Sequence, residues 1–359
     1  MNLKPVQLGF YMPAEWHEHQ ATWMAWPYDP ITFPQRVHIV EKVFAKIIYH
    51  LHLNENIELL VLNKEMQNQA EKILQLNHVN IKKITFHQAD YADVWTRDYA
   101  PTFLINLNHK DTSKKTAWIK WQYNAYGNKF AELLKDNEVP YQIKDYLHQT
   151  MFESGIIMEG GAIDVNGKGS LITTEECLLN KNRNYDLNKQ QIENKLKSYL
   201  GVNNIIWLKR GIIGDHTDGH VDEVARFVNE NTIVYAYEEN KNNPNFEILE
   251  NNFQTLKNAT DQDGKPFNLV KLPMPQMNYD DGETAPVSYA NFYIANKSVL
   301  APQFSHKNDK IAIDILQKLF LNREVIGIDS KDIIYGGGAI HCITQQQPNI
   351  SHSCGSYRA

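Results

Sequence analysis

A cysteine close behind three glycines is the first candidate for chemistry in this chain of 359 residues. Cys342 follows the run Gly336-Gly337-Gly338, and glycine lets the backbone turn tightly and removes side-chain obstruction. A ligand can therefore approach the thiol closely, which suits a thiolate nucleophile. The alternative interpretation is that Cys342 is a buried small hydrophobic residue. Cys177 and Cys354 lack such neighbours, and for both we expect a structural or solvent-exposed position.

A histidine and an aspartate two positions apart offer acid/base chemistry. On a strand, the side chains of His220 and Asp222 would point to the same face, because side-chain direction has a period of two. An acid/base group and a carboxylate would then share one pocket. Two other interpretations of segment 214–223 stay open. One is a solvated polar loop, and the other is a site for zinc or manganese.

Trp95, Asp98 and Glu159 could supply the remaining groups of a site for a flat cation. An aromatic face and a carboxylate attract such a cation by cation–π and charge-assisted contacts. The alternative is a buried Trp95 beside an ion pair of Arg97 with Asp98. Glu159 precedes two glycines, and it either orients His220 or lies on the surface.

A thiol, a histidine and several carboxylates together indicate nucleophilic attack on a positively charged carbon, as in a guanidinium group. Asp98 and Asp222 would hold the guanidinium, and Cys342 would attack its central carbon. His220 would protonate the departing ammonia and then activate water, leaving a ureido product. Two further alternatives are a metal-dependent hydrolase and a guanidino-binding protein without catalysis. A zinc deaminase is excluded because the chain has no Cys-x-x-Cys pair.

The elements that must position these residues are short and numerous. Hydrophobic periodicity predicts helices over 38–52, 64–76, 187–200, 245–257 and 309–321. Strands are predicted over 57–62, 81–87, 101–107, 116–123, 161–165, 171–174, 205–209, 224–227, 232–237, 268–272, 289–294, 298–301 and 324–328. Turn-like spacers at 166–169, 229–231 and 296–297 indicate hairpins. A loosely repeated β-β-α-β unit in one continuous α/β domain, residues 1–359, is therefore expected.

Composition limits the partners. The formal net charge is −6, and no basic block interleaved with aromatic residues is present, so nucleic acid is not an expected partner. No apolar run approaches the length of a membrane span, and no signal-peptide pattern opens the sequence. Three widely spaced cysteines do not form a disulfide framework. We expect a cytoplasmic protein without a membrane partner.

Several motifs together resemble those of one enzyme family. They are Trp95-Thr96-Arg97-Asp98, Glu159-Gly160-Gly161, 174–180 with 182–184, Gly219-His220-Val221-Asp222 and 340–348, with 12–16 and 21–27 near the start. Over residues 11 to 348 the chain resembles the agmatine deiminase family, which also contains the Porphyromonas-type peptidylarginine deiminases. The resemblance implies the pentein fold, a five-bladed α/β propeller of ββαβ modules with pseudo-fivefold symmetry. It also implies hydrolysis of agmatine to N-carbamoylputrescine and ammonia through a covalent thiouronium intermediate, in polyamine metabolism, without a cofactor or metal.

The resemblance also implies roles for individual residues. Cys342 would be the nucleophile, His220 the general acid/base and Glu159 its orienting partner. Asp98 and Asp222 would clamp the guanidinium, while Trp95 would form a pocket wall. Gly337 and Gly338 would let the backbone crowd the reacting carbon, and Arg97 would organise the carboxylates. A homodimer is expected on the same basis.

One position departs from the family pattern. Members that act on agmatine often carry an acidic residue four positions before the catalytic histidine, where this chain has His216. Asp215, Asp218 or the acidic loop 279–283 could compensate by meeting a cationic tail. Glu223 also stands where many relatives have Asn. Free arginine and, less favoured, peptidylarginine are therefore kept as alternative substrates of the same deiminase chemistry, with citrulline as the product.

Overall fold

Sixteen strands and a set of mostly short helices form the part of the chain that the computed structural model describes, residues 3–350. The strands are β1 (His19–Ala25), β2 (Asn56–Val61), β3 (Ile84–Gln88), β4 (Thr102–Ile105), β5 (Thr116–Gln122), β6 (Thr150–Ile157), β7 (Ile163–Val165), β8 (Ser170–Thr174), β9 (Asn204–Leu208), β10 (Ala225–Asn229), β11 (Thr232–Tyr237), β12 (Asn268–Pro273), β13 (Tyr293–Ile294), β14 (Ser298–Gln303), β15 (Glu324–Asp329) and β16 (Gln345–Pro348). The helices are α1 (Val37–Leu51), α2 (Lys64–Leu76), α3 (Thr96–Tyr99), α4 (Ala125–Asn128), α5 (Val139–Leu147), α6 (Glu175–Leu178), α7 (Lys181–Asn184), α8 (Lys189–Leu200), α9 (Asn245–Asn258) and α10 (Asp309–Leu319).

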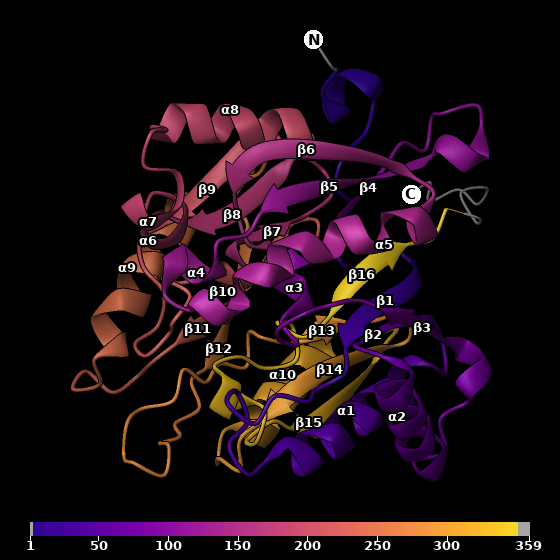
Figure 1. The fold of residues 1–359 in the computed structure, drawn as a ribbon. Coiled ribbons are helices and arrows are strands. Elements are labelled where there is room, and N and C mark those ends of the chain that lie inside the picture. The colour runs from indigo at the N-terminus through magenta and orange to yellow at the C-terminus, as the bar shows by residue number, and fades with distance from the viewer. Residues whose placement is uncertain (1–2, 351–359) are drawn as a thin grey trace.

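The strands form five sheets that repeat one topology (Figure 1). In the sheets β4-β5-β6, β7-β8-β9, β10-β11-β12 and β13-β14-β15, the first two strands are antiparallel and the third is parallel to the second. Helical segments connect the second strand to the third, because a parallel pair needs a crossover connection. The repeated β-β-α-β unit and the predicted five-module α/β fold class are confirmed.

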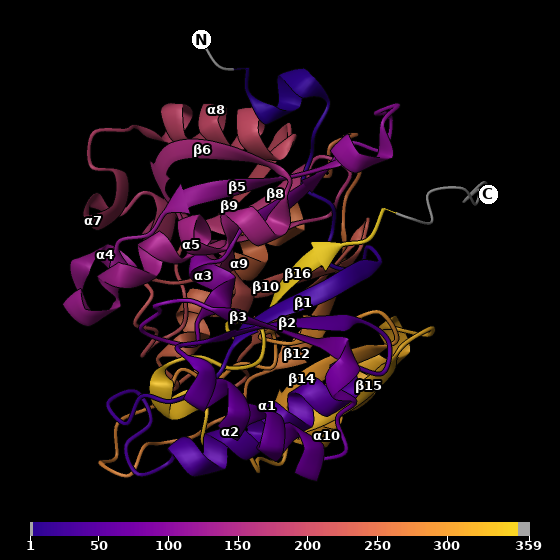
Figure 2. The same cartoon turned by 45° about the vertical axis from the view of Figure 1, so that its right-hand side comes forward.

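The fifth sheet joins segments that are far apart in the sequence. Strand β16 pairs antiparallel with β1, which pairs in parallel with β2, and β3 extends the sheet on the far side of β2. Figure 2 shows β16 lying beside β1. The unit β16-β1-α1-β2 therefore repeats the topology of the other four sheets.

The longer helices lie outside the strands. In Figure 1, α8 lies above the strands, α9 to the left, and α1 and α2 below. Helix α1 buries one apolar stripe that includes Val40, Phe44 and Ile48, while its polar side chains alternate with that stripe at helical spacing. The clusters of buried apolar side chains each contain residues of more than one sheet, so the cores join neighbouring modules. Within residues 3–350, we find no helix that is both long and apolar enough to cross a membrane.

The predicted helices are confirmed as α1, α2, α8, α9 and α10, and the three hairpin spacers connect antiparallel strands. The prediction of a strand over 289–294 is wrong for its first part, because a turn held by Ser288 precedes β13. Residues 81–83 form a 3₁₀ turn that Asn80 caps, so β3 starts later than predicted. Strands β1, β6 and β16 and helix α5 were not predicted.

The same position of every module faces the candidate site. The segment just before the first strand of each sheet carries Asp98, Glu159, the pair His220 and Asp222, Asn291, and Cys342, in that chain order. Helix α3 and the 3₁₀ turns 160–162 and 221–223 belong to these segments and lie in contact. The repeat therefore brings five separate segments to one place.

Candidate functional site

Cys342 lies in the turn before β16, with 7% of its surface exposed. Gly338 packs against it so closely that an added Cβ would lie 3.1 Å from Sγ and 2.8 Å from the Trp95 ring. Gly336 packs against the same ring, where an added Cβ would be 2.7 Å away. The glycines therefore allow the backbone to approach Cys342 and Trp95, and Trp95 is buried beside them.

Negative charge surrounds this thiol. Burial raises the pKa of Cys342 well above its ordinary value, and the carboxylates of Asp222, Glu223 and Asp98 raise it further. Oδ2 of Asp222 lies 3.9 Å from Sγ. Burial and these carboxylates therefore favour the neutral thiol, and a cation bound among them would favour the thiolate.

His220, Asp222 and Asp98 converge on the backbone of Gly161. A Cβ added to Gly161 would lie 2.6 Å from Nδ1 of His220, 2.9 Å from Oδ2 of Asp222 and 3.0 Å from Oδ1 of Asp98. His220 and Asp222 do not lie on a strand, the arrangement that would have placed both side chains on one face. A 3₁₀ turn, Val221–Glu223, begins directly after His220, whose backbone N–H donates to Asp215 and Thr217.

The charges of this trio depend on one another. Nδ1 of His220 lies 3.7 Å from Oδ1 of Asp98. Burial alone would lower the pKa of His220, but the carboxylate of Asp98, with Cys177 and Asp222, raises it well above its ordinary value. Burial raises the pKa of Asp98 to about 6, although His220 opposes the shift. The hydroxyl of Tyr126 and the backbone N–H of Gly161 donate to the two Asp98 oxygens, at 2.8 and 3.0 Å.

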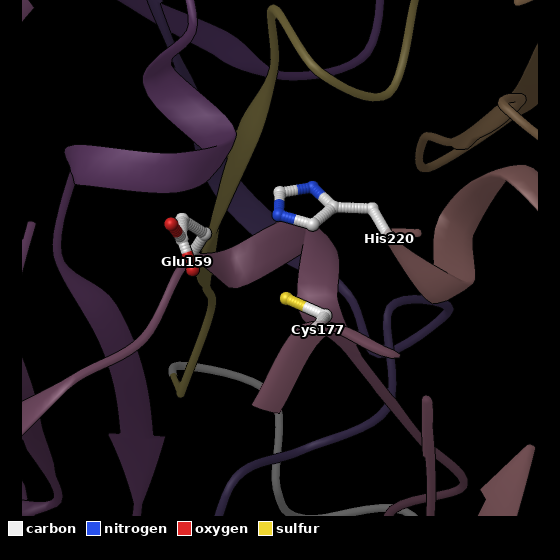
Figure 3. Close-up of side chains that lie close together, drawn as sticks. All are labelled: Glu159, Cys177 and His220. Atoms are coloured by element: carbon white, nitrogen blue, oxygen red, sulfur yellow. The ribbon is translucent and has the colours of Figure 1, made fainter. Parts of the chain in front are cut away.

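Glu159 and Cys177 lie beside His220, and Figure 3 shows the three side chains directed toward a common space. Their potential ligand atoms all lie within 4.8 Å of one another. Nε of Arg183 donates to Oε1 of Glu159 at 2.7 Å, while Oε2 has no hydrogen-bond partner within residues 3–350. Cys177 is buried within the site, which the sequence did not indicate, and Cys354 lies outside the described residues.

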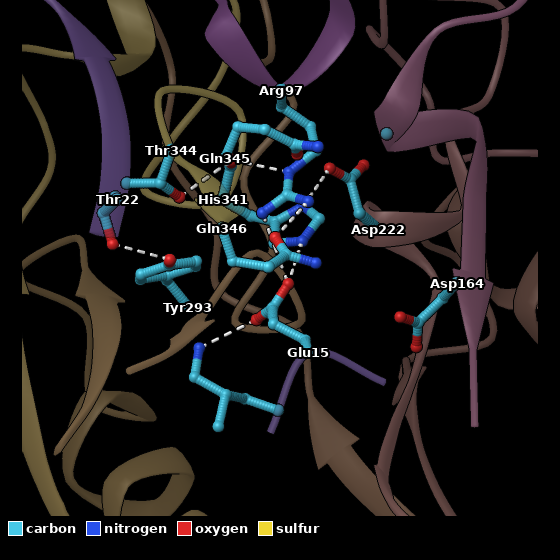
Figure 4. A network of polar contacts seen from close by, with 12 residues as sticks. Glu15, Thr22, Arg97, Asp164, Asp222, Tyr293, His341, Thr344, Gln345 and Gln346 are labelled. Carbon is cyan, nitrogen blue, oxygen red and sulfur yellow. Dashed lines mark hydrogen bonds and ion pairs between the residues drawn. The ribbon is translucent and has the colours of Figure 1, made fainter. Parts of the chain in front are cut away.

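A buried chain of charged groups continues from Asp222 (Figure 4). Nδ1 of His341 contacts Oδ2 of Asp222 at 2.7 Å, and Nε2 contacts Oε2 of Glu15 at 2.7 Å. Burial would raise the pKa of Glu15, but Arg226, His341 and Arg97 lower it well below its ordinary value. Burial likewise opposes the lowered pKa of Asp222, which His341 produces by its hydrogen bond and charge. Both carboxylates are therefore charged, and His341 bridges them.

The contacts of Asp222 leave one of its oxygens available. Oδ2 is held by His341, whereas Oδ1 is buried without a hydrogen-bond partner in the described part of the chain. One interpretation of the sequence proposed an ion pair of Arg97 with Asp98, but Arg97 pairs with other residues. Its guanidinium donates to Glu15 at 3.3 Å and to Gln346 at 2.8 Å. Oδ1 of Asp222 can therefore accept a hydrogen bond from a bound group.

His216 is exposed at the edge of the site. Its ring meets Phe130 edge to face at 6.3 Å between ring centroids, and Cδ2 would lie 3.5 Å from a Cβ added to Gly337. Asp215 and Asp218, the acidic residues beside it, are engaged elsewhere. Asp215 accepts from the backbone N–H and the hydroxyl of Thr217 and from the backbone of His220.

Asp218 and the acidic loop are also engaged. Asp218 accepts from Lys129, Asn182 and Arg183, and Asp280 accepts from Arg36 at 2.7 Å. These carboxylates therefore stabilise the loops around the site.

Two buried groups have side chains of the kind that bind metal ions. They are Glu159 with Cys177 and His220, and Asp222 with Glu223 and Cys342. Each group mixes a thiol with harder ligands, a set that zinc accepts. The same residues also suit thiol chemistry on a cation, so a measurement must separate the two.

Sequence reasoning missed several residues that the structure brings into or next to the site. Burial, together with Asp222 and Asp215, raises the pKa of Glu223 well above its ordinary value, and its Oε2 is buried without a hydrogen-bond partner within residues 3–350. Glu15 and His341 stood within motifs used for the resemblance, but no local pattern assigned them a partner. Asn291 could have been found from the module repeat, since it holds the position that carries a site residue in the other modules. Arg183 likewise stood within a motif used for the resemblance, whereas Tyr126 gave no signal of this kind.

Comparison with known proteins identifies relatives of the whole chain. The family model described as Porphyromonas-type peptidyl-arginine deiminase matches residues 11–348. An agmatine deiminase of Medicago truncatula is 36% identical over 96% of this chain and 98% of its own. The solved agmatine deiminase of Enterococcus faecalis is 30% identical, with a TM-score of 0.89 over 98% of this chain and 99% of that chain.

An agmatine deiminase of C. jejuni, solved with substrate bound, is also 30% identical, with a TM-score of 0.82 over 95% of this chain and 96% of that chain. The match over nearly all of the chain agrees with the fold and with the motifs of the site. The chain belongs to the Porphyromonas-type peptidyl-arginine deiminase family.

Proposed function

We propose that the chain is an agmatine deiminase, a hydrolase that converts agmatine and water to N-carbamoylputrescine and ammonia. One observation carries the proposal: a buried thiol, a histidine and the carboxylates of Asp98 and Asp222 meet beside Gly161 and the Gly336–Gly338 run. A planar cation with several N–H donors satisfies the unpartnered carboxylate oxygen there, and guanidinium has that form. The agmatine deiminases among the relatives support this choice of guanidino compound.

The reaction divides into two steps on Cys342. In the first, Asp98 and Asp222 hold the guanidinium, Sγ forms a bond to its central carbon, and ammonia leaves with a proton from His220. In the second, His220 takes a proton from water, the resulting hydroxide attacks the same carbon, and the C–S bond breaks. The thiolate is restored and a ureido product departs. Glu159, which Arg183 holds on one oxygen, orients His220.

The electrostatics favour attack only when substrate is present. Burial raises the pKa of Cys342, and the carboxylates of Asp222, Glu223 and Asp98 raise it further. A bound guanidinium offsets their charge and makes the thiolate accessible at neutral pH. Trp95, Gly337 and Gly338 form the wall next to the reacting carbon, and His216 lies where the substrate tail leaves the pocket.

The remaining properties are part of the same proposal. Residues 1–359 act as one catalytic domain, which the five similar sheets support. The protein works in the cytoplasm as a homodimer on a small guanidino substrate, with no nucleic-acid or membrane partner and no cofactor or metal. Resemblance to the family supports the homodimer, and the net charge of −6 supports a cationic substrate.

The test is ammonia release by the purified protein from agmatine, with free arginine in parallel, in the presence and absence of a chelator. We expect release from agmatine that the chelator does not affect. Cys342→Ser should abolish release and still bind agmatine in calorimetry, whereas Cys354→Ser, the same change at a cysteine outside the motifs of the site, should retain turnover.

Each of the other outcomes would support a different substrate or function. Release from arginine alone would assign the tail preference to the surroundings of His216 and overturn agmatine as substrate. Loss of activity with the chelator, and activity retained in Cys342→Ser, would support a metal-dependent hydrolase. Binding without ammonia release in the wild-type protein would indicate a binding protein.

A further inference from the structure

Asn291 occupies the one module position whose side chain has so far been given no role. It lies two residues before β13, as Asp98, Glu159, His220 and Cys342 lie just before the first strands of the other sheets. The residue is fully buried. A buried amide is costly unless its donors and acceptor are paired, so its contacts indicate what it does.

The contacts of Asn291 fix the orientation of its amide. The backbone N–H of His341 donates to Oδ1 at 2.9 Å. Because a backbone N–H can only donate, the group facing it must be the oxygen, and the opposite group is the NH₂. Nδ2 then lies 3.2 Å from Sγ of Cys342 and donates to it.

The backbone around Asn291 is held as firmly as its side chain. Nη1 of Arg226 donates to the carbonyls of Ala290 and Phe292, at 3.3 and 2.8 Å, on either side of Asn291. Arg226 is itself buried and paired with Glu15 at 3.0 Å. The amide donor is therefore positioned before substrate arrives, which is the condition for electrostatic stabilisation in an active site.

We propose that Asn291 is a catalytic residue, whose side-chain N–H stabilises the Cys342 thiolate. The inference rests on the proposed role of Cys342 as nucleophile. Three carboxylates around Cys342 oppose the thiolate, and the Asn291 amide is a neutral donor that favours the anion.

The same contact assists both steps of the reaction. Asn291 gives up no proton. It stabilises Sγ as an anion before attack, and again when the C–S bond breaks and the electron pair returns to sulfur.

The test measures the thiolate directly, without substrate. The rate at which iodoacetamide alkylates Cys342 is followed against pH by mass spectrometry of the peptide that contains it. In Asn291→Ala, we expect the midpoint of this profile to move up by about one pH unit, which is about a tenfold loss of thiolate at a fixed pH. The kcat of ammonia release should fall, since the thiolate is then less stable as nucleophile and as leaving group.

Asn252 provides a matched control. It is a buried asparagine whose Oδ1 accepts from the backbone of Lys209 and whose Nδ2 donates to the carbonyl of Arg210, away from the site. Asn252→Ala should leave the alkylation midpoint unchanged. Equal midpoints in the wild type and Asn291→Ala would overturn the proposal. Failure of the wild type on agmatine would overturn only the proposed function, since alkylation needs no substrate.

A second measurement covers the case in which Asn291→Ala does not fold. In the wild-type protein, the NMR signals of the Asn291 side-chain amide should shift over the pH range in which Cys342 becomes alkylated. In Cys342→Ser they should stay constant over that range. An amide signal that does not follow the thiol in the wild type would overturn the proposal.

Discussion

Asp98 has a pKa that makes its charge depend on pH within the working range of an enzyme. Burial raises this pKa from 3.8 to about 6, against the opposing charge of His220. The proposed guanidinium clamp needs the carboxylate, so kcat/KM should fall as the pH is lowered through about 6. Asp98→Asn should lower kcat/KM by about 100-fold, since a charge-assisted hydrogen bond is lost. A profile that is flat through this range would contradict the assignment.

The raised pKa of Asp98 also makes the free energy of unfolding depend on pH. Its pKa is raised on folding, so the folded state holds the proton more tightly than the unfolded state does. The free energy of unfolding should therefore decline as the pH rises from 3.8 to about 6, and it should stay lower above that pH range. Asp98→Asn should melt at a higher temperature than the wild type at pH 8, with the difference disappearing below that range. Asp145→Asn, a change at an exposed aspartate of α5, is the control for both readouts.

At the residue scale, the sequence predicted the chemical types of the site but not all of their partners. Cys342 could be identified from the three glycines before it, and His220 and Asp222 from the polar segment 214–223. The pairing of Arg97 with Glu15, and of His341 with Asp222, joins residues that are far apart in the chain. No local pattern records such contacts, because the fold alone brings those segments together.

At the scale of elements, the turn before β7 depends on two adjacent glycines with different neighbours. A Cβ on Gly160 would lie 2.1 Å from the backbone carbonyl oxygen of Arg97, whereas one on Gly161 would meet the side chains of His220, Asp222 and Asp98. Gly160→Ala should therefore reduce the free energy of unfolding by about 2 kcal/mol, because backbone must move. Gly161→Ala should retain a nearly normal stability and lose about 100-fold in kcat/KM through displaced side chains. Urea unfolding and ammonia release measure the two effects, and equal losses of stability would contradict this distinction.

Elements with an apolar period were predictable, and elements held by polar contacts were not. Helices α1 and α2 bury clear stripes, whereas β16 is a buried Gln-Gln-Gln-Pro segment. Its glutamines hydrogen-bond with Trp23, Arg97 and the carbonyl of Pro101 in place of apolar packing. Strand β6 is half exposed and contains Gly155, so its apolar residues follow neither the helical spacing nor the alternation of a strand.

At the scale of the whole molecule, buried charge joins the modules. Arg226 in β10 is fully buried and lies 3.0 Å from Glu15 and 3.4 Å from Asp164. Arg226→Met should lower the free energy of unfolding by about 3–5 kcal/mol, because two buried carboxylates lose their partner. Lys310→Met, at a pair with Asp314 whose side chains are 83% and 53% exposed, should cost about 1 kcal/mol or less. Chemical denaturation of both variants checks the prediction, which similar losses would contradict.

The pairing of β16 with β1 sets the order in which a newly made chain gains its activity. A ribosome produces the clamp residues Asp98 and Asp222 long before Cys342 and β16 emerge. The antiparallel partner of β1 is β16, which is synthesised near the end of the chain. The sheet that contains β1 is therefore completed last. A nascent chain interrupted before Cys342 therefore carries Asp98, Asp222 and Cys177 without the proposed nucleophile, and Cys342 joins them only as the final strand β16 pairs with β1.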